Sequence, residues 1–165
     1  MIVQTSSSSQ RRHGHWAPGS RELNAAARQH LLSQGEQWTE LRANVFEVVA
    51  QDGEPISAYE AADRLSRLSG RRIAVNSVYR ILDLFVANNL VKRIESRNAY
   101  MANTHPGCLH DCIFLICESC GHIGHLDDDQ LAQEMRRRAE LANFAPRQAV
   151  LELVGLCQNC RNPQN

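Results

Sequence analysis

The most constraining feature of this sequence is a pair of Cys-x-x-Cys motifs, Cys117-Glu-Ser-Cys120 and Cys157-Gln-Asn-Cys160. Two thiolates three residues apart can turn onto one metal ion, and two such motifs complete a tetrahedral sulfur site of the kind that holds structural zinc. The 36 residues between the motifs exceed the loop of a simple zinc ribbon. We therefore expect a small folded unit between them, whose two ends the metal ties together.

Two disulfides, or two unrelated redox pairs, are the alternative interpretations of these four cysteines. A disulfide framework requires an oxidising compartment. The chain begins with a polar, serine-rich stretch, and it carries no apolar run suited to a signal peptide or a membrane span. These features favour the zinc site and predict a cytoplasmic protein without membrane association.

Charge is distributed unevenly, although the formal net charge is zero. From Ser57 to Arg97 there are eight lysines and arginines against four acidic residues, whereas all six cysteines and four of the seven histidines lie from residue 105 onward. A locally basic half joined to a metal-binding half is typical of a DNA reader with a metal sensor. Ordinary solvated arginines on helix surfaces are the alternative, and charge alone leaves it open.

Capping residues and helical periodicity predict three helices in the first seventy residues. Ser20, Thr39 and Ser57 are expected to cap helices that end near residues 34, 51 and 69. Phe46 is expected on the flank of the buried face of the second helix. Leu68 is expected within the buried face of the third helix, because it follows its apolar neighbours at helical spacing.

A fourth helix and a hairpin are predicted to follow. The helix begins at Asn76 or Ser77 and ends near residue 88, and short strands over residues 90–94 and 99–101 are joined by a turn. Helices followed by such a hairpin form the winged-helix version of helix-turn-helix. In that motif the N-terminal residues of the recognition helix enter the major groove of DNA.

The remaining sequence predicts a small unit of strands and one helix. The apolar run Cys112–Cys117 predicts a well-covered strand, and residues 123–126 its hairpin partner. A helix begins at residues 127–129 and reaches about residue 142. A last strand over residues 149–154 precedes the second cysteine pair, and its apolar edge favours pairing with a second subunit.

The expected fold class is therefore α+β, with an N-terminal winged-helix DNA-binding domain and a small C-terminal α/β dimerisation domain. The expected boundaries are a disordered tail over residues 1–19, the winged helix over 20–102, a hinge over 103–107, and the dimerisation and metal-binding domain over 108–165.

Several of these segments resemble the ferric uptake regulator (Fur) superfamily. The resemblance rests on Ile56–Tyr59, Ser77–Arg80, Leu115–Gly121 and Gly155–Cys160. Within the superfamily, the segments Arg93–Tyr100 and Phe114–Cys117 look most like the zinc uptake regulator branch. The iron-sensing branch usually carries a run rich in His and Asp before this cysteine, and the chain has Asp111-Cys-Ile-Phe there.

The resemblance implies a homodimer that binds double-stranded operator DNA and represses zinc-uptake genes. It implies two zinc ions per subunit, one structural and one exchangeable near the hinge, and neither an enzymatic activity nor a small-molecule substrate. The DNA contacts that we expect come from Tyr59, Arg72, Asn76, Ser77, Tyr79 and Arg80. Further phosphate contacts are expected from Arg64, Arg67, Arg71 and Arg97.

Potential ligands for the exchangeable ion gather between residues 105 and 125. Mixed nitrogen and sulfur donors favour zinc over iron(II) or manganese(II), which take more oxygen. Two ligand positions of the family fall on Lys92 and Asn103, which are poor ligands. The expected sensor set is His105, Cys108, His110 and His125, with Cys112 and His122 in reserve.

Other functions remain open from the sequence alone. A family member could sense iron or manganese instead, and Cys108 with Cys112 could form a peroxide or thiol-redox sensor. An enzyme that uses zinc at the hinge is disfavoured, because no glutamate lies at His-Glu-x-x-His spacing. DNA binding under buffered zinc, iron and manganese separates the metal alternatives.

Overall fold

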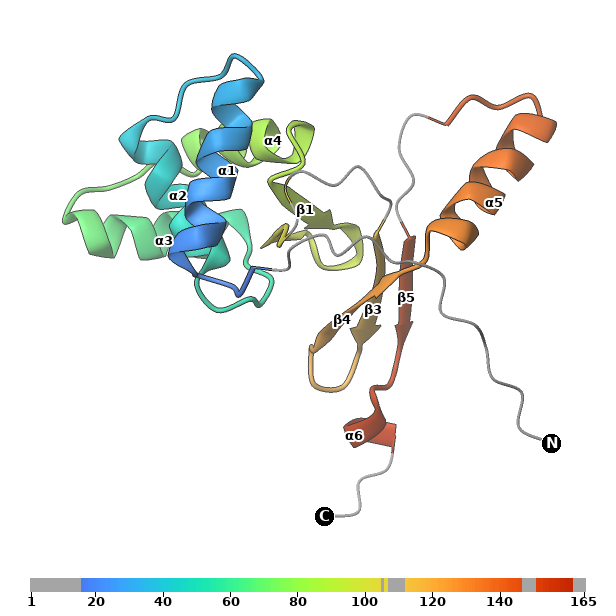
Figure 1. Cartoon of the computed structure of the whole chain (residues 1–165). Helices are drawn as coiled ribbons and strands as arrows, with labels where there is room; N and C mark the ends of the chain where they lie inside the picture. Colours follow the sequence, from blue (N-terminus) through green and yellow to red (C-terminus); the bar gives the residue numbers. More distant parts are fainter. Residues whose placement is uncertain (1–15, 105, 107–111, 147–150, 162–165) are drawn as a thin grey trace.

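The computed structural model describes residues 16–104, 106, 112–146 and 151–161, and it consists of a helical part and a small sheet (Figure 1). The helical part contains α1 (Arg21–Ser33), α2 (Glu40–Ala50), α3 (Ala58–Ser69), α4 (Val75–Ala87), β1 (Val91–Ile94), the 3-10 turn η1 (Glu95–Arg97) and β2 (Ala99–Ala102). The second part contains β3 (Cys112–Cys117), β4 (Ile123–Asp127), α5 (Asp129–Leu141), β5 (Leu151–Gly155) and α6 (Gln158–Arg161). This order confirms the predicted fold class. The exact domain boundaries stay a prediction, because much of the expected hinge lies outside the described residues.

The first three helices begin where the sequence predicts. The hydroxyls of Ser20, Thr39 and Ser57 each accept a hydrogen bond from the backbone N–H three residues later, at 3.1, 3.3 and 3.2 Å. Glu60 completes a capping box, because its carboxylate accepts the backbone N–H of Ser57 at 2.9 Å. Each cap satisfies an otherwise unpaired N–H and contributes about 1 kcal/mol to helix stability.

The predicted start of α4 is wrong. The helix begins at Val75, and Ala74 occupies the N-cap position without a side-chain cap hydrogen bond. Packing sets the start instead, since Ile73 and Val75 pack against the helical core and the Ser66 hydroxyl accepts the backbone N–H of Ile73 at 2.9 Å. The first turn of α4 therefore has no side-chain cap in front of it.

An aromatic trio occupies the centre of the helical core and corrects the prediction for Phe46. Phe46 is fully buried, and its ring meets those of Trp38 and Phe85 edge to face, with 5.8 Å between centroids in both cases. Trp38 and Phe85 stack at 6.0 Å. The prediction for Leu68 is also wrong, since its side chain is 75% exposed near the end of α3.

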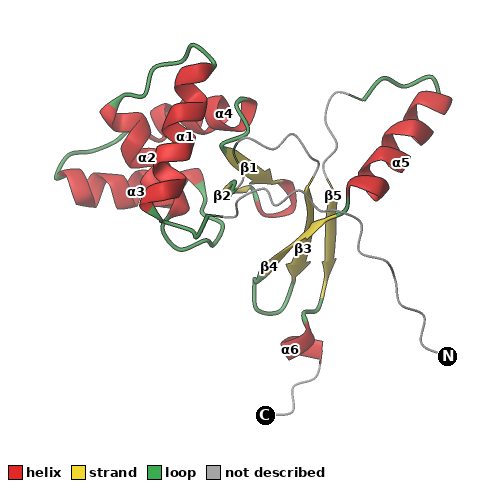
Figure 2. Ribbon diagram, viewed as in Figure 1, coloured by secondary structure: helices red, strands yellow, loops and turns green. Residues whose placement is uncertain are grey.

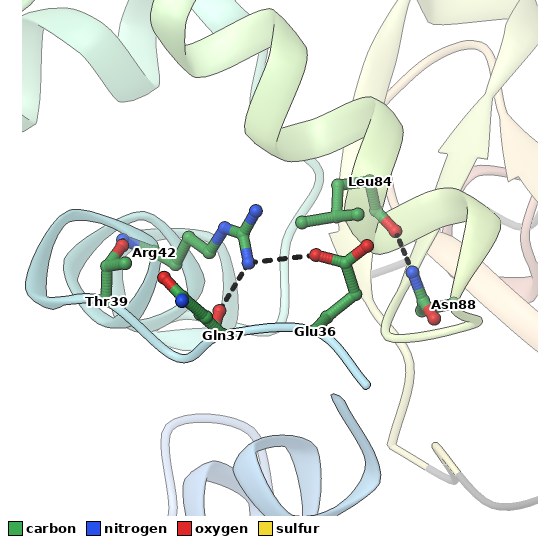
Figure 3. Close-up of polar contacts among 6 residues, drawn as sticks. All are labelled: Glu36, Gln37, Thr39, Arg42, Leu84 and Asn88. Carbon is green, nitrogen blue, oxygen red and sulfur yellow. Dashed lines mark hydrogen bonds and ion pairs between the residues drawn. The ribbon is translucent and has the colours of Figure 1, made fainter. Parts of the chain in front are cut away.

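The loop between α1 and α2 is held by Arg42 (Figure 3). Its guanidinium donates to the carboxylate of Glu36 at 3.2 Å and to the backbone carbonyl of Gln37. In the same region, the Asn88 side-chain amide donates to the carbonyl of Leu84 at 2.8 Å and closes the end of α4. The Arg42 contacts thus hold the loop that carries Trp38.

The hairpin β1–β2, with η1 at its tip, is called the wing below and spans residues 91–102. Its strands pair antiparallel, from Val91 opposite Ala102 to Ile94 opposite Ala99. Asn98 has a φ of 46° and takes the left-handed conformation that turns the chain into β2. Ile56, just before α3, exchanges two backbone hydrogen bonds of 2.8 Å with Tyr100 and thereby joins the wing to the helices.

The second part is a three-stranded sheet in the order β4-β3-β5 (Figure 2). β3 pairs antiparallel with β4 and parallel with β5, so the chain crosses over through α5 before it returns. The Asp128 side chain caps α5 by accepting the backbone N–H of Leu131 at 2.9 Å. β5 lies at an edge of the sheet, and the sheet lies between the helical part and α5 in Figure 1.

None of the helices in the described ranges has the length and apolar composition that a membrane crossing requires.

Candidate metal centre and nucleic-acid interface

The two cysteine pairs meet at one end of the three-stranded sheet. The parallel register of β3 and β5 ends with Cys117 opposite Gly155, so the cysteine pairs that follow lie at the same end of the two strands. The sulfur atoms of Cys117, Cys120, Cys157 and Cys160 all lie within 4.8 Å of one another. Gly121, with a φ of 80°, closes the first pair by donating its N–H to the carbonyl of Cys117 at 3.0 Å.

The four sulfurs are free thiols rather than disulfides. The Cys120 and Cys157 sulfurs are 3.7 Å apart, well beyond a disulfide bond of about 2.05 Å. The backbone N–H of Cys157 donates to the Cys117 sulfur at 3.3 Å, and this bond is the main cause that lowers the pKa of that thiol to about 6. Cys117 is therefore prepared to act as a thiolate.

The donor set fits a tetrahedral divalent metal. Four sulfurs bound to zinc at about 2.3 Å lie about 3.8 Å from one another, close to the 3.7 Å that separates Cys120 from Cys157. The side-chain hydrogen bond with Ser119 lowers the pKa of the Cys160 thiol. Contacts with the sulfurs of Cys120 and Cys157 outweigh it and raise this pKa to about 12. Four thiolates in this space therefore require a cation between them.

Most of the predicted sensor ligands lie outside the described residues. His105, Cys108 and His110 lie outside the described residues, and the side chains of Cys112 and His125 do so as well. His122 has an exposed side chain after the first cysteine pair. The sensor set therefore stays a prediction.

Lys92 and Asn103, which fall on two ligand positions of the resembled family, lie close together in the structure. Both line a cavity of about 160 Å³ together with Phe114 and Ile123. Asn103 is 6% exposed, and its side-chain amide donates to the carbonyl of Asn89 at 2.8 Å. Its backbone N–H also donates to Leu90, so Asn103 anchors the chain where it leaves the wing.

The predicted nucleic-acid residues gather on α3 and at the start of α4. Tyr59 is 65% exposed, and its ring meets that of Tyr79 edge to face at 6.2 Å. Arg72 and Arg80 are exposed, and so are the two residues beside the uncapped start of α4, Asn76 and Ser77. Helix starts of this kind present backbone N–H groups and a positive dipole end to anions.

A surface depression of about 610 Å³ lies between α3 and α4. Its lining includes Tyr59 together with Arg67, Arg71 and Arg72. Arg67 forms an ion pair with Asp63 on the same helix, and Arg64 pairs with Asp52 at 2.9 Å. Arg71 and Arg72 are exposed in the loop just before α4, and they suit a phosphate backbone.

Sequence reasoning missed the role of two residues that join the wing to the sheet. Arg97, expected at a phosphate, donates to the backbone carbonyl of Cys117 at 2.9 Å. Glu152, on β5, accepts the backbone N–H groups of Glu95 and Ser96 at 2.6 and 3.0 Å. No local signal reveals these contacts, because the partners of Glu152 lie 57 and 56 residues away in the sequence.

Comparisons of the sequence and of the structure with known proteins both find regulators of metal uptake. The ferric uptake regulator family model matches residues 33–154, which is more than half of the chain. The zinc uptake regulation protein of Escherichia coli is 28% identical over 152 residues and covers 88% of each chain.

Two solved structures share the fold over 86% of this chain. Holo XcZur is 34% identical, with a TM-score of 0.76 over 86% of this chain and 99% of that one. A zinc uptake regulator complexed with zinc and DNA is 27% identical, with a TM-score of 0.79 over 86% of this chain and 94% of that one. The chain belongs to the ferric uptake regulator family.

Proposed function

We propose that this protein is a zinc-responsive transcriptional repressor that acts in the cytoplasm. A homodimer would bind double-stranded operator DNA when zinc occupies the sensor site, and would thereby repress zinc-uptake genes. The observation that carries this proposal is the exposed reading surface of α3 and α4, held in an arrangement that resembles the zinc- and DNA-bound regulator. This function is regulatory rather than enzymatic.

The structural zinc would be held by Cys117, Cys120, Cys157 and Cys160. Its support is the sulfur cluster within 4.8 Å and the low pKa of Cys117, about 6. When bound, the ion supplies a rigid cross-link between the ends of β3 and β5. The strands position the cysteines, because β3 ends at Cys117 and β5 ends two residues before Cys157.

A second, exchangeable zinc would be held near residues 103–107, the proposed hinge between the winged helix over 20–102 and the dimerisation domain over 108–165. The proposed ligands remain His105, Cys108, His110 and His125, with Cys112 and His122 in reserve. Their support is the donor chemistry of the sequence, because imidazole and thiolate together favour zinc. A ligand that binds only one domain arrangement shifts the population toward it.

The surface of α3 and α4 would read the DNA. Arg80 would read a guanine edge, Tyr79 would pack on a thymine methyl group, and Tyr59 would lie near the DNA surface. Asn76 and Ser77 lie at the uncapped helix start, where phosphate or base contacts are favourable. Arg72 would hold a phosphate and fix the register of the protein on the duplex.

A second copy of the chain would cover the apolar surfaces of β5 and α5. Leu153 and Val154 are 58% and 57% exposed on an edge strand, which favours pairing with another strand. Other large apolar side chains that are exposed on or near α5 and beside β5 are Leu131, Met135, Leu141, Phe144 and Leu156. Exposed apolar area of this kind marks an interface rather than a solvated face.

The test is equilibrium DNA binding with a duplex selected from a random pool in the presence of zinc. Fluorescence anisotropy would be measured under buffered zinc, iron(II) and manganese(II), and metal content would be counted by native mass spectrometry. We expect two zinc ions per subunit, and tight binding only when both are present. Equal affinity after the exchangeable ion is stripped, with the four-sulfur ion retained, would refute the proposal. A peroxide titration that abolishes binding by cysteine oxidation alone would identify a redox sensor instead.

A further inference from the structure

The wing touches the sheet through a carboxylate that reaches its tip. The two oxygens of Glu152 accept separate backbone N–H groups, from Glu95 at 2.6 Å and from Ser96 at 3.0 Å. These donors begin η1, which has no side-chain cap of its own. Burial alone would raise the pKa of Glu152, but the hydrogen bonds from Ser96 and Glu95 bring the pKa below its ordinary value.

A second polar contact joins the wing to the metal centre itself. Arg97 donates from its guanidinium to the backbone carbonyl of Cys117 at 2.9 Å. The same carbonyl accepts the N–H of Gly121 at 3.0 Å, so it belongs to the turn that presents the first cysteine pair. A Cβ at Gly121 would lie only 3.3 Å from the Arg97 guanidinium, which shows how closely the arginine rests on this turn.

An apolar contact lies beside these hydrogen bonds. Ile94, Phe114 and Ile116 are 0%, 5% and 3% exposed and form one cluster that spans the wing and β3. Met101 of β2 and Ile123 of β4 pack against it. The wing is therefore held by charge-assisted hydrogen bonds around a buried apolar centre, a combination that defines one orientation rather than a loose contact.

We propose that Glu152 and Arg97 form a latch through which the four-cysteine centre holds the wing, and with it the winged helix, in the DNA-binding orientation. The inference rests on the proposed function. It makes Glu152 and Arg97 positioning residues, and it replaces the phosphate contact expected of Arg97. The domain arrangement that they hold is the one shared with the zinc- and DNA-bound regulator. Loss of the latch lowers the population of this arrangement and weakens DNA binding in proportion, without changing the reading residues.

The latch also predicts an effect in the opposite direction. Coupling between two sites is reciprocal, so a released wing should loosen the turn that carries Cys117. Zinc at the four-cysteine centre should then be lost faster to a chelator. This measurement needs no DNA and is independent of any sensor metal.

The first test is amide hydrogen exchange in the zinc-loaded dimer. Glu152→Gln keeps the shape of the side chain but removes its charge and one acceptor, and Glu152→Ala removes both acceptors. We expect exchange at Glu95 and Ser96 to rise at least fivefold in either variant. Glu140→Gln makes the same chemical change at an exposed position on α5 and should leave these amides unchanged. Equal exchange in Glu152→Gln, Glu152→Ala and Glu140→Gln would overturn the latch.

The second test measures zinc release and DNA affinity in Arg97→Gln. We expect release to a chelator to accelerate several-fold, and the duplex to bind about tenfold more weakly at unchanged base preference. Arg28→Gln removes an arginine from the exposed surface of α1 and controls for the lost charge. If the wild type shows no zinc-dependent DNA binding, the proposed function fails. If the wild type binds and Arg97→Gln behaves like Arg28→Gln in both assays, the latch alone fails.

Discussion

Phe46→Leu is the substitution that most directly tests the helical core beneath the reading surface. Phe46 is fully buried and makes edge-to-face contacts with Trp38 and Phe85 at 5.8 Å each. Each such ring pair contributes about 0.5–1.5 kcal/mol beyond area burial, so losing two costs about 1–3 kcal/mol. The smaller leucine also leaves unfilled volume, which adds to the cost. We expect the free energy of unfolding to fall by about 2–4 kcal/mol in total.

Urea unfolding of the zinc-loaded protein measures this change. Protein concentration is held fixed, since the proposed dimer makes stability concentration-dependent. Tryptophan fluorescence follows the transition, because Trp38 stacks on Phe85 at 6.0 Å and both Trp16 and Trp38 pack against the helical core. Leu68→Ala is the control, and its 75% exposed side chain predicts a loss within about 0.5 kcal/mol. A Phe46→Leu variant no less stable than Leu68→Ala would refute the role given to the trio.

The remaining predictions concern DNA reading, acid stability and assembly. Arg80→Ala should relax base preference at one position and cost about 1–3 kcal/mol, whereas Arg72→Ala should weaken all duplexes alike and lower the salt slope by about one, as anisotropy titrations at several salt concentrations would show. Hydrogen bonds from the backbone N–H of Ser57 and, as the smaller cause, from its hydroxyl lower the pKa of Glu60 from its ordinary value of 4.5. This contact therefore stabilises the fold fully above that value, and its contribution is lost as the pH falls through the lowered pKa. Thermal melts of Glu60→Gln between pH 3 and 6 should consequently show a shallower loss of stability on acidification than the wild type, and identical slopes would contradict this. Leu153→Asp should yield monomers in sedimentation velocity at concentrations where the wild type is dimeric, while Leu68→Asp should not.

The sequence predicts those parts of the fold that depend on neighbours along the chain. Ser20, Thr39 and Ser57 begin their helices as predicted, because an N-cap bonds an N–H only three residues away. The start of α4 was predicted wrongly, because packing of Ile73 and Val75 decides it and no local cap takes part.

Burial within a helix depends on elements that the sequence does not place. Phe46 is buried because Trp38 and Phe85, from a loop and another helix, close around it. Leu68 continues an apolar periodicity but lies near the end of α3, one turn beyond Leu65, the last buried residue of that helix. Periodicity identifies a face of a helix, whereas the neighbouring elements decide how far that face is covered.

The metal centre and the latch differ in the same way. Cys-x-x-Cys spacing is a local signal, and it was enough to predict that the two cysteine pairs meet, as their sulfurs do within 4.8 Å. Glu152 meets the wing only because β5 pairs with β3 in one particular register, 57 residues after Glu95. Nothing near Glu152 in the sequence distinguishes it from any other carboxylate in a strand.

The parallel pairing of β3 with β5 also affects how the chain acquires its structure. β4 follows β3 directly, whereas Leu151 must return to Ile113 after the excursion through α5. Contacts between distant segments form slowly, because closing a long loop costs entropy before any contact compensates for it. The helical part, whose elements contact their sequence neighbours, should therefore fold in an early kinetic phase, and the sheet in a later one. Zinc added during refolding should accelerate only the later phase. A newly made chain would therefore complete its DNA-reading helices before the sheet and the four-cysteine centre that hold them in place.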